Sequence, residues 1–118
     1  MLEIGNGGQS VIQSRTHFSF WAGLKSPLMM GHDLTRMSND TFDILANEEV
    51  IAISQDPLGK SISLVLRDEF FDVWTGPLSE GDWVICELFS NRFLVHTNTI
   101  FDSTLQQKIH CERLQTIT

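Results

Sequence analysis

The spacing of apolar residues changes once along this chain, from helical spacing in its first half to alternation in its second half. Four residues in the first half recur at helical spacing, and they predict a helix with one apolar face: Val11, Phe18, Trp21 and Ala22. Ser10 and Gln13 have the spacing of a capping box, which predicts the start of this helix. Its end is predicted near Lys25, because Pro27 disfavours helical geometry at the residue before it.

Two short apolar runs flank this predicted helix. The first, residues 1–4, leads into the sequence GNGG at residues 5–8, whose glycines permit backbone angles that other residues avoid. It is predicted to be the end of a strand that runs into a loop. The second run, residues 27–31, contains no polar residue and predicts a strand buried on both faces, as in a parallel sheet. Residues 32–34 are predicted to form the loop that follows it.

Two shorter helices are predicted next. Ser38 is suited to cap a helix that carries Phe42, Leu45 and Ala46. Asn47 is suited to cap another helix over residues 48–55, whose first turn holds two glutamates that the helix dipole favours. The sequence DPLG at residues 56–59 then breaks the helical pattern.

Beyond Gly59 the pattern is typical of antiparallel strands. Residues 61–67 alternate, with Ile62, Leu64 and Leu66 on one face, and residues 76–82 form a turn-rich connection between two later β-rich runs. A weak helix is predicted over residues 105–114. The predicted strands are residues 61–67, 70–75, 83–89 and 93–100.

This order of elements predicts two different kinds of structure in one chain. Strand, helix, strand and helix in succession indicate α/β units, whereas the run of strands after them indicates an all-β module. The division is predicted near residues 57–60, which gives one domain over residues 1–57 and a second over residues 58–118.

Composition and charge narrow the class of protein. Hydrophobic residues make up 42% of the chain and charged residues 19%, which indicates a globular protein rather than a disordered or membrane-spanning one. The formal net charge of -7 argues against nucleic acid and anionic membranes as partners, because both are bound through clustered basic residues. Residues 1–5 show no pattern of a signal peptide, so the chain is either cytosolic or preceded by further sequence.

Few side chains show spacing that points to chemistry. Cys86 and Cys111 could pair, but two distant cysteines define no disulfide framework. Residues 39–41 form a glycosylation sequon, which matters only in a secretory context. Asp33 follows a predicted strand and is expected to be structural. No metal site is predicted, since no histidine has ligand spacing to another His, Cys or carboxylate: His17, His32, His96 and His110.

Four stretches of the chain resemble the melibiase family, glycoside hydrolase family 27, in order and in spacing. The resemblance extends over about residues 1–84, and residues 109–118 resemble nothing in the family. The stretches are MLEIGNGG at 1–8; THFSFW at 16–21 with KSPL at 25–28; MS at 37–38 with NEEVIAISQDPLG at 47–59; and VWTGPLS at 73–79.

The resemblance implies a fold. Family members have a (β/α)₈ TIM barrel followed by a C-terminal antiparallel β-sandwich. A whole barrel needs roughly 250 residues, so this chain of 118 residues is expected to be a C-terminal fragment. Residues 1–57 would be the last βα units of the barrel, from the end of strand 7 to helix 8, and residues 58–118 the start of the sandwich.

The resemblance also implies a function, namely α-galactosidase activity on terminal α-linked galactose in a secreted enzyme without a cofactor. Two aspartates about 5 Å apart would act with retention of configuration, one as nucleophile and one as acid and base. In the family both lie upstream of the segment that matches Met1, so this chain would hold no catalytic residue and would be inactive alone. Met1 matches a methionine that contacts the sugar, and four residues would shape the active-site loop: Gly5, Asn6, Gly7 and Gly8.

A second hypothesis remains beside this one. The chain could be a non-catalytic protein that binds carbohydrate or another partner through its β module. That hypothesis predicts a chain that folds cooperatively by itself, whereas the first predicts poor solubility for a barrel piece with bare apolar faces.

Overall fold

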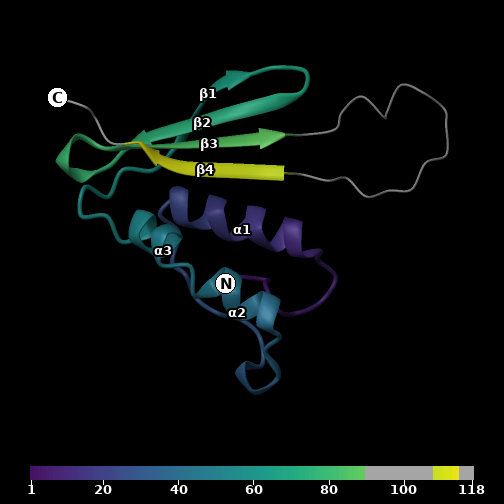
Figure 1. The fold of residues 1–118 in the computed structure, drawn as a ribbon. Helices are drawn as coiled ribbons and strands as arrows, with labels where there is room; N and C mark the ends of the chain where they lie inside the picture. The colour runs from purple at the N-terminus through teal and green to yellow at the C-terminus, as the bar shows by residue number, and fades with distance from the viewer. Residues whose placement is uncertain (90–107, 115–118) are drawn as a thin grey trace, which may run out of the picture.

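The computed structural model describes residues 1–89 and 108–114 (Figure 1). These residues form an α/β structure in which one antiparallel sheet covers a group of helices. The prediction of a strand over residues 93–100 lies outside the described residues. In chain order the elements are α1 (Val11–Gly23), η1 (Leu34–Arg36), α2 (Asn39–Leu45), α3 (Glu48–Ser54), β1 (Ser63–Arg67), β2 (Phe71–Pro77), η2 (Ser79–Gly81), β3 (Trp83–Phe89) and β4 (Lys108–Leu114).

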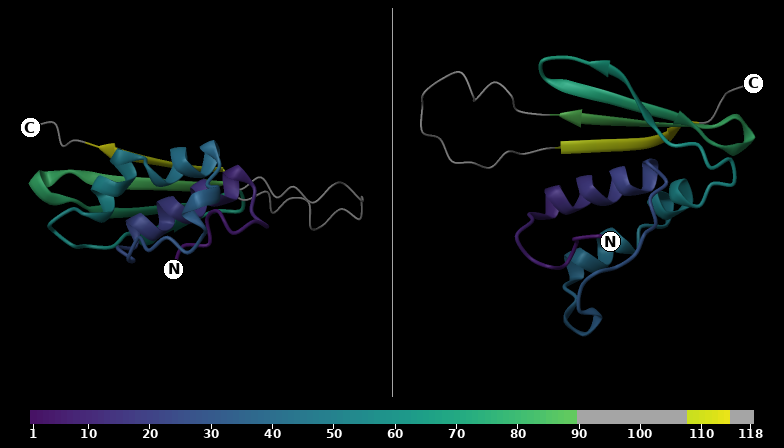
Figure 2. Two further views of the ribbon diagram at one scale, coloured as in Figure 1. Left: turned by 90° about the horizontal axis from the view of Figure 1, so that it is seen from below. Right: turned by 180° about the vertical axis from the view of Figure 1, so that it is seen from behind.

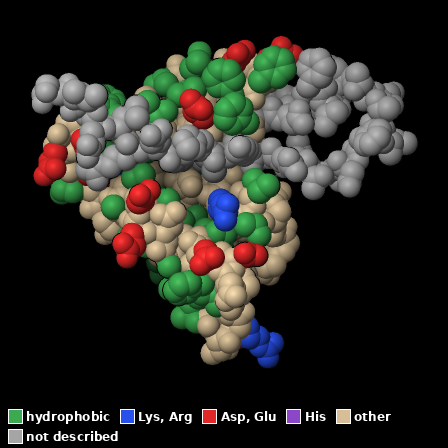
Figure 3. Space-filling view, in the orientation of Figure 1, with side chains coloured by type: hydrophobic (Ala, Val, Ile, Leu, Met, Phe, Trp, Pro, Cys, Tyr) green, Lys and Arg blue, Asp and Glu red, His purple; other side chains and the backbone are tan. Residues whose placement is uncertain are grey.

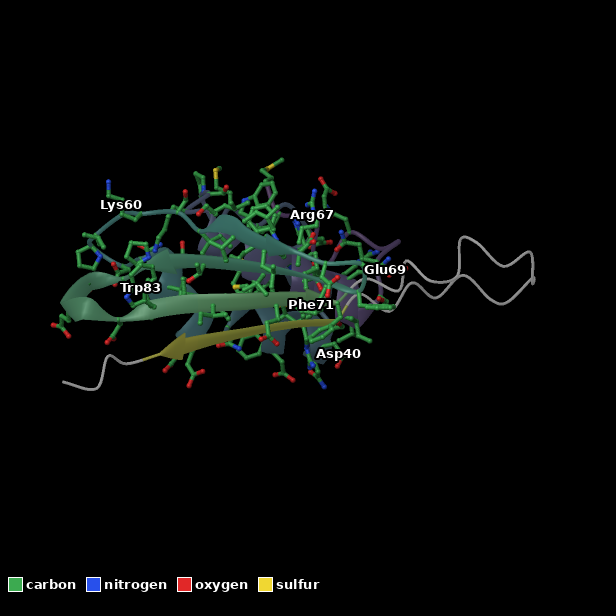
Figure 4. All side chains as sticks on the ribbon, turned by 90° about the horizontal axis from the view of Figure 1, so that it is seen from above. Asp40, Lys60, Arg67, Glu69, Phe71 and Trp83 are labelled. Carbon is green, nitrogen blue, oxygen red and sulfur yellow. The ribbon has the colours of Figure 1, made fainter. Side chains whose placement is uncertain are left out.

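The sheet has four strands in the order β1-β2-β3-β4, and every neighbouring pair is antiparallel. The predicted β2–β3 hairpin is confirmed, with Phe71 opposite Phe89 at one end and Pro77 opposite Trp83 at the other. Figure 4 labels Phe71 and Trp83 at these opposite ends of the sheet. Since the β1–β2 and β2–β3 connections are short, the first three strands pair in their sequence order.

Helix α1 lies between two apolar clusters, which explains why its apolar residues do not form a single stripe. One cluster fills the space between the sheet and the helices: Ile53, Ile62, Leu78, Val84 and Cys86, with Phe20 and Trp74 against it. The other lies on the opposite side of α1: Leu2, Ile4, Phe18 and Ile44, with Trp21 and Leu28 among its neighbours. Figures 1 and 2 show the sheet on one side of α1 and helix α2 on the other. The predicted apolar face is confirmed for Phe18 and Trp21, which belong to the second cluster, and for Ala22, which is buried, whereas Val11 is 39% exposed.

The predicted helix starts are confirmed by their hydrogen bonds. Ser10 and Gln13 form the capping box of α1, in which each side chain accepts a backbone N–H of the other residue. Ser38 Oγ accepts the N–H of Thr41 at 3.2 Å, and Asn47 Oδ1 accepts the N–H of Val50 at 3.2 Å. The side chains of α2 differ from expectation, because Ile44 is its buried residue and Phe42 is exposed.

Residues 27–31 do not form the strand that their composition predicts. They make one parallel bridge, between Leu2 and Met30, and the side chains of Met29 and Met30 are 58% and 50% exposed. A strand buried on both faces needs covering layers and a pairing partner on each edge. Among the described residues, the backbone of this segment pairs on one edge only, through the bridge to Leu2.

The alternation in residues 61–67 is also broken. Ile62 is buried as predicted, but the pairing of β1 with β2 shifts between Leu64 and Leu66, which indicates a β-bulge, and both leucines are exposed. A bulge places an extra residue in one strand and reverses the facing of those after it. Edge strands carry such bulges more often than central ones, and β1 is an edge strand.

The helix predicted over residues 105–114 is wrong where the structure describes it. Residues 108–114 form strand β4, which pairs with β3 along its length. Cys86 is disulfide-bonded, and Cys111, the other cysteine of the chain, is its register partner across the two strands. This cross-strand constraint and the ladder of β3 outweigh a weak helical preference.

Reduction of the disulfide is expected to destabilise the chain by about 3 kcal/mol, a typical value for a native bridge that closes a loop of this length. Urea unfolding with and without dithiothreitol measures this difference. A Cys86→Ala/Cys111→Ala double variant is the control, because its unfolding midpoint should not respond to the reductant. Equal midpoints for the oxidised and reduced chains would contradict the expectation.

Asp56 fastens the helical half of the chain to the sheet. Its carboxylate accepts the Ser79 N–H at 3.0 Å and the Ser79 hydroxyl at 2.7 Å, and it accepts the Leu58 N–H at 3.0 Å. Within the helical half, Lys25 links the end of α1 to α3 by donating from Nζ to the carbonyl of Ile53. The predicted boundary at residues 56–59 is thus a turn with a buried acidic anchor at its start.

None of the helices in the described part of the chain is both long and apolar enough to cross a membrane.

Candidate functional site

Two loops begin at the same edge of the helical half. Leu2 and Met30 form a parallel bridge, and the Leu2 N–H donates to the Met29 carbonyl at 2.8 Å. Helix α1 makes the crossover between these two segments, as parallel neighbours require. Because the segments run in the same direction, the loops that follow them, residues 5–8 and 31–38, leave at the same end. In α/β barrels the loops at this end carry the chemistry.

Gly5 lies directly under the ring of His32. Its φ is +91°, and a Cβ placed on it would come within 2.7 Å of His32 Cγ. Both ring nitrogens of His32 are buried and have no hydrogen-bond partner among the described residues. A glycine is therefore needed at position 5 both for its backbone angle and for the space that His32 occupies.

Asn6 is fastened to the start of the loop. Its Nδ2 donates to Glu3 Oε2 at 3.1 Å, and its backbone N–H donates to the Glu3 carbonyl at 3.2 Å. The Glu3 N–H in turn donates to His17 Nε2 at 3.2 Å, and the His17 ring stacks at a tilt on Trp21 with centroids 4.8 Å apart. This network ties the loop to helix α1.

Gly7 and Gly8 lie at the open part of the loop. Their φ angles are +84° and +81°, and a Cβ on either would meet no atom within 4 Å. Gly8 borders a hollow of about 290 Å³ against the first turns of α1, together with Gln13 and His17. Gly7 borders a second hollow of about 240 Å³ that reaches Ser38 at the start of α2. The loop is thus flanked by hollows on both sides.

Met1 lies beside the second loop. Its side chain is 72% exposed, and a Cβ placed on Gly31 would come within 3.5 Å of Met1 Cβ and 2.9 Å of the Leu2 carbonyl oxygen. The structure therefore brings Met1 and Gly5 against the same short segment, Gly31 and His32. Gly7 and Gly8 extend away from it.

The acidic residue nearest this edge has a structural role. Asp33 caps η1 by accepting the N–H and the hydroxyl of Thr35, at 2.9 and 2.7 Å. These hydrogen bonds, the side-chain one first, hold the pKa of Asp33 below its usual value. Among the described residues no group of three or more His, Cys, Asp or Glu is placed to hold a metal ion.

His32 is the residue of this site that sequence reasoning did not find. No sequence pattern links it to Gly5, which is 27 positions away. The glycines at residues 5–8 indicate an unusual backbone and no particular neighbour. Only the parallel pairing of the two segments shows that the neighbour of Gly5 is the His32 ring.

The stability of the chain is expected to fall as the pH drops below about 6.5, the ordinary pKa of histidine. Burial lowers the pKa of His17, and the nearby Glu3 carboxylate opposes this only in part. As the pH falls, His17 therefore binds a proton in the unfolded state before it does so in the folded state. Protonation of His17 Nε2 also removes the hydrogen bond that this atom accepts from the Glu3 N–H, which is worth about 1 kcal/mol. Thermal unfolding of wild type and His17→Gln between pH 5 and 7.5 tests this. An unchanged slope in the variant would show that another group is responsible.

Comparison with known proteins identifies relatives of this chain. A melibiase family model, described as alpha galactosidase A, matches residues 1–56. An α-galactosidase of Oryza sativa subsp. japonica is 52% identical over 81 residues, which are 69% of this chain and 19% of that protein. The solved structure of α-galactosidase I from Mortierella vinacea superposes with a TM-score of 0.73 at 25% identity, over 97% of this chain and 35% of that one.

A third relative was solved with a sugar. The structure of the α-galactosidase from Saccharomyces cerevisiae with raffinose has a TM-score of 0.70 and 33% identity, over 75% of this chain and 22% of that one. The chain spans about a fifth of the length of the curated relatives that it matches, 19% and 21% of two plant enzymes. By sequence and by fold, the chain belongs to the melibiase family of α-galactosidases, which are glycoside hydrolases.

Proposed function

We propose that this chain is the C-terminal part of a retaining α-galactosidase. Residues 1–57 would complete the (β/α)₈ barrel, and residues 58–118 would begin the β-sandwich that follows it. The parallel bridge of Leu2 and Met30 across α1 supports the first assignment, because consecutive barrel strands are parallel with a helix between them. The antiparallel order of β1–β4 supports the second.

The two loops at the shared edge would form one side of the sugar site. Met1 is suited to an apolar contact with the sugar, since it is exposed beside Gly31. Residues 5–8 would shape the adjoining wall, with Gly5 held by His32 and with the glutamate-bound side chain of Asn6 fixing the turn. Gly7 and Gly8 would leave room for substrate, because a side chain at either position would project into open space.

The chemistry would come from residues outside this chain. One aspartate would attack the anomeric carbon, and a second would protonate the leaving oxygen and later activate water, so that the configuration is retained. No cofactor takes part in this mechanism. The substrate would be a terminal α-linked galactose, as in the raffinose with which one relative was solved.

A secretory route is part of this proposal. The disulfide at Cys86 supports it, because disulfides persist in oxidising compartments and are rare in the cytosol. The bond is buried in the core of the sheet, where Cys86 is 1% exposed. This position is typical of a structural bridge rather than of a redox-active one.

Hydrolysis of a chromogenic α-galactoside tests the function. The full-length protein that contains this chain is expected to release the chromophore, and the 118-residue chain to give the buffer rate. Activity of the chain alone would overturn the placement of the catalytic aspartates. Inactivity of the full-length protein towards α-galactosides, combined with calorimetric binding of galactose by the chain alone, would favour a non-catalytic carbohydrate-binding role instead.

A further inference from the structure

One motif of the sequence has no role in the hydrolase chemistry, namely the sequon formed by Asn39, Asp40 and Thr41. Asn39 is the first residue of α2, and it is exposed, as is Asp40, which Figure 4 labels. The Asn39 side chain makes no hydrogen bond within the part of the chain that the structure describes. A group attached to its Nδ2 would therefore displace no contact.

The cap of α2 is made by other residues. Ser38 Oγ accepts the Thr41 N–H at 3.2 Å and donates to Thr41 Oγ1 at 3.0 Å. Asn39 is a good capping residue by type, yet the chain places it one position after the cap, where its side chain has no part in the start of the helix. The helix thus does not depend on a free Asn39 amide.

The disulfide independently indicates that the chain passes through a compartment in which N-linked glycans can be attached. Cys86 is disulfide-bonded within the core of the sheet, so the chain matures where disulfides form. In eukaryotic cells the same compartment attaches glycans to exposed Asn-X-Thr sequences. An exposed sequon and a buried disulfide in one chain therefore point to the same route.

The surface next to Asn39 is partly apolar, and a glycan would shield it from water. Phe42, three residues later on the same helix, is 60% exposed, and residues three apart on a helix are surface neighbours. Hydrophobic side chains also reach the surface beside α2 on the face drawn in Figure 3. A bulky, hydrated sugar chain at position 39 would cover this apolar surface.

We propose that Asn39 carries an N-linked glycan. The Asn39 Nδ2 bonds to the anomeric carbon of an oligosaccharide donated by a lipid diphosphate carrier; the lipid diphosphate leaves, and the amide loses one proton. The glycan then lies on the same side as the loops of residues 5–8 and 31–38, since the start of α2 follows the second of them directly.

The test is expression of the 118-residue chain behind a cleavable secretory leader in a eukaryotic host, with intact mass measured before and after treatment with peptide N-glycosidase. Cells and medium are both analysed, so that chain that stays inside the cells is also measured. The wild type is expected to lose the mass of one N-linked glycan on treatment and to show an aspartate at position 39. This readout is independent of galactosidase activity, so its failure would not affect the proposed function.

Four variants sharpen the result. Asn39→Gln and Thr41→Ala should abolish the mass difference, and Thr41→Ser should keep it. Asn47→Gln is the matched control, because Asn47 is an exposed helix-starting asparagine with glutamate two positions later. An unmodified wild type, or a mass difference that persists in Asn39→Gln, would overturn the proposal.

Discussion

Gly5→Ala is expected to destabilise the chain by about 3 kcal/mol. A side chain at φ +91° costs about 1–2 kcal/mol, and forcing Cβ to within 2.7 Å of His32 Cγ adds a clash of about 1–3 kcal/mol. The clash cannot be relieved by a flexible side-chain end, because His32 Cβ is also only 3.1 Å away. The loop or the His32 segment must therefore move as a whole.

Gly7→Ala is the matched control for this measurement. Its φ of +84° is similar, but an added Cβ would meet no atom within 4 Å, so a loss of only about 1 kcal/mol is expected. Urea denaturation of the two variants gives the comparison. Equal losses would mean that the contact between Gly5 and His32 has no energetic weight, and the packing of the two loops would need another explanation.

Asp56→Ala is expected to cost about 3 kcal/mol and to loosen the sheet from the helices. The substitution leaves the N–H and hydroxyl of Ser79 and the N–H of Leu58 without their acceptor. Hydrogen bonds to a charged group contribute about 1.5–3 kcal/mol each when buried, and less where water can reach the donors, as at Leu58 and the half-buried Ser79. Asp40→Ala is the control, because Asp40 is exposed and lies in the first turn of α2. If both variants unfold at the same urea concentration, Asp56 is not an anchor.

The same carboxylate is expected to make the fold sensitive to acid. Burial raises the pKa of Asp56, but hydrogen bonds from Ser79 and Leu58 outweigh burial, and the pKa lies below its ordinary value. Its stabilisation is therefore present above the pKa of an unfolded aspartate, about 3.9, and is lost as the pH falls through the lower folded value. Unfolding curves between pH 5 and 2.5 should show this loss in wild type and a weaker one in Asp56→Ala.

Local signals in the sequence predicted the helices and the hairpin well. The hydroxyl and amide caps at Ser10, Ser38 and Asn47 are local interactions, so the starts of α1, α2 and α3 could be read directly. The strands β2 and β3 were recognised because a turn-rich connection separates two β-rich runs. These elements depend on neighbours within a few positions, which a single sequence displays.

The incorrect predictions concern features that depend on residues far apart in the sequence. The alternation of Leu64 and Leu66 gives no sign of the bulge in the pairing of β1 with β2. Strand β4 forms opposite β3, with paired residues 19 to 31 positions apart in sequence and with Cys86 and Cys111 as register partners. In α1, Phe18 and Trp21 of the predicted face pack in one cluster, whereas Phe20, outside that face, packs in the other, because layers on both sides of the helix become visible only in three dimensions.

The candidate site was predicted in part for the same reason. The glycines of residues 5–8 indicated an unusual backbone, and Gly5 and Gly7 do have positive φ. The partner of Gly5, His32, and the position of Met1 beside Gly31 depend on the parallel pairing of two segments about 28 residues apart. The roles of these residues towards a sugar came from family resemblance alone and remain predictions.

Met1 and residues 5–8 are expected to border the galactose site of a complete α-galactosidase. A crystal structure of the full-length protein with bound galactose is the test. We expect the Met1 side chain to be in van der Waals contact with the sugar and residues 5–8 to form the adjoining wall, with the two catalytic aspartates contributed by the rest of the protein. Galactose bound away from both segments, or a catalytic carboxylate from within residues 1–118, would contradict it.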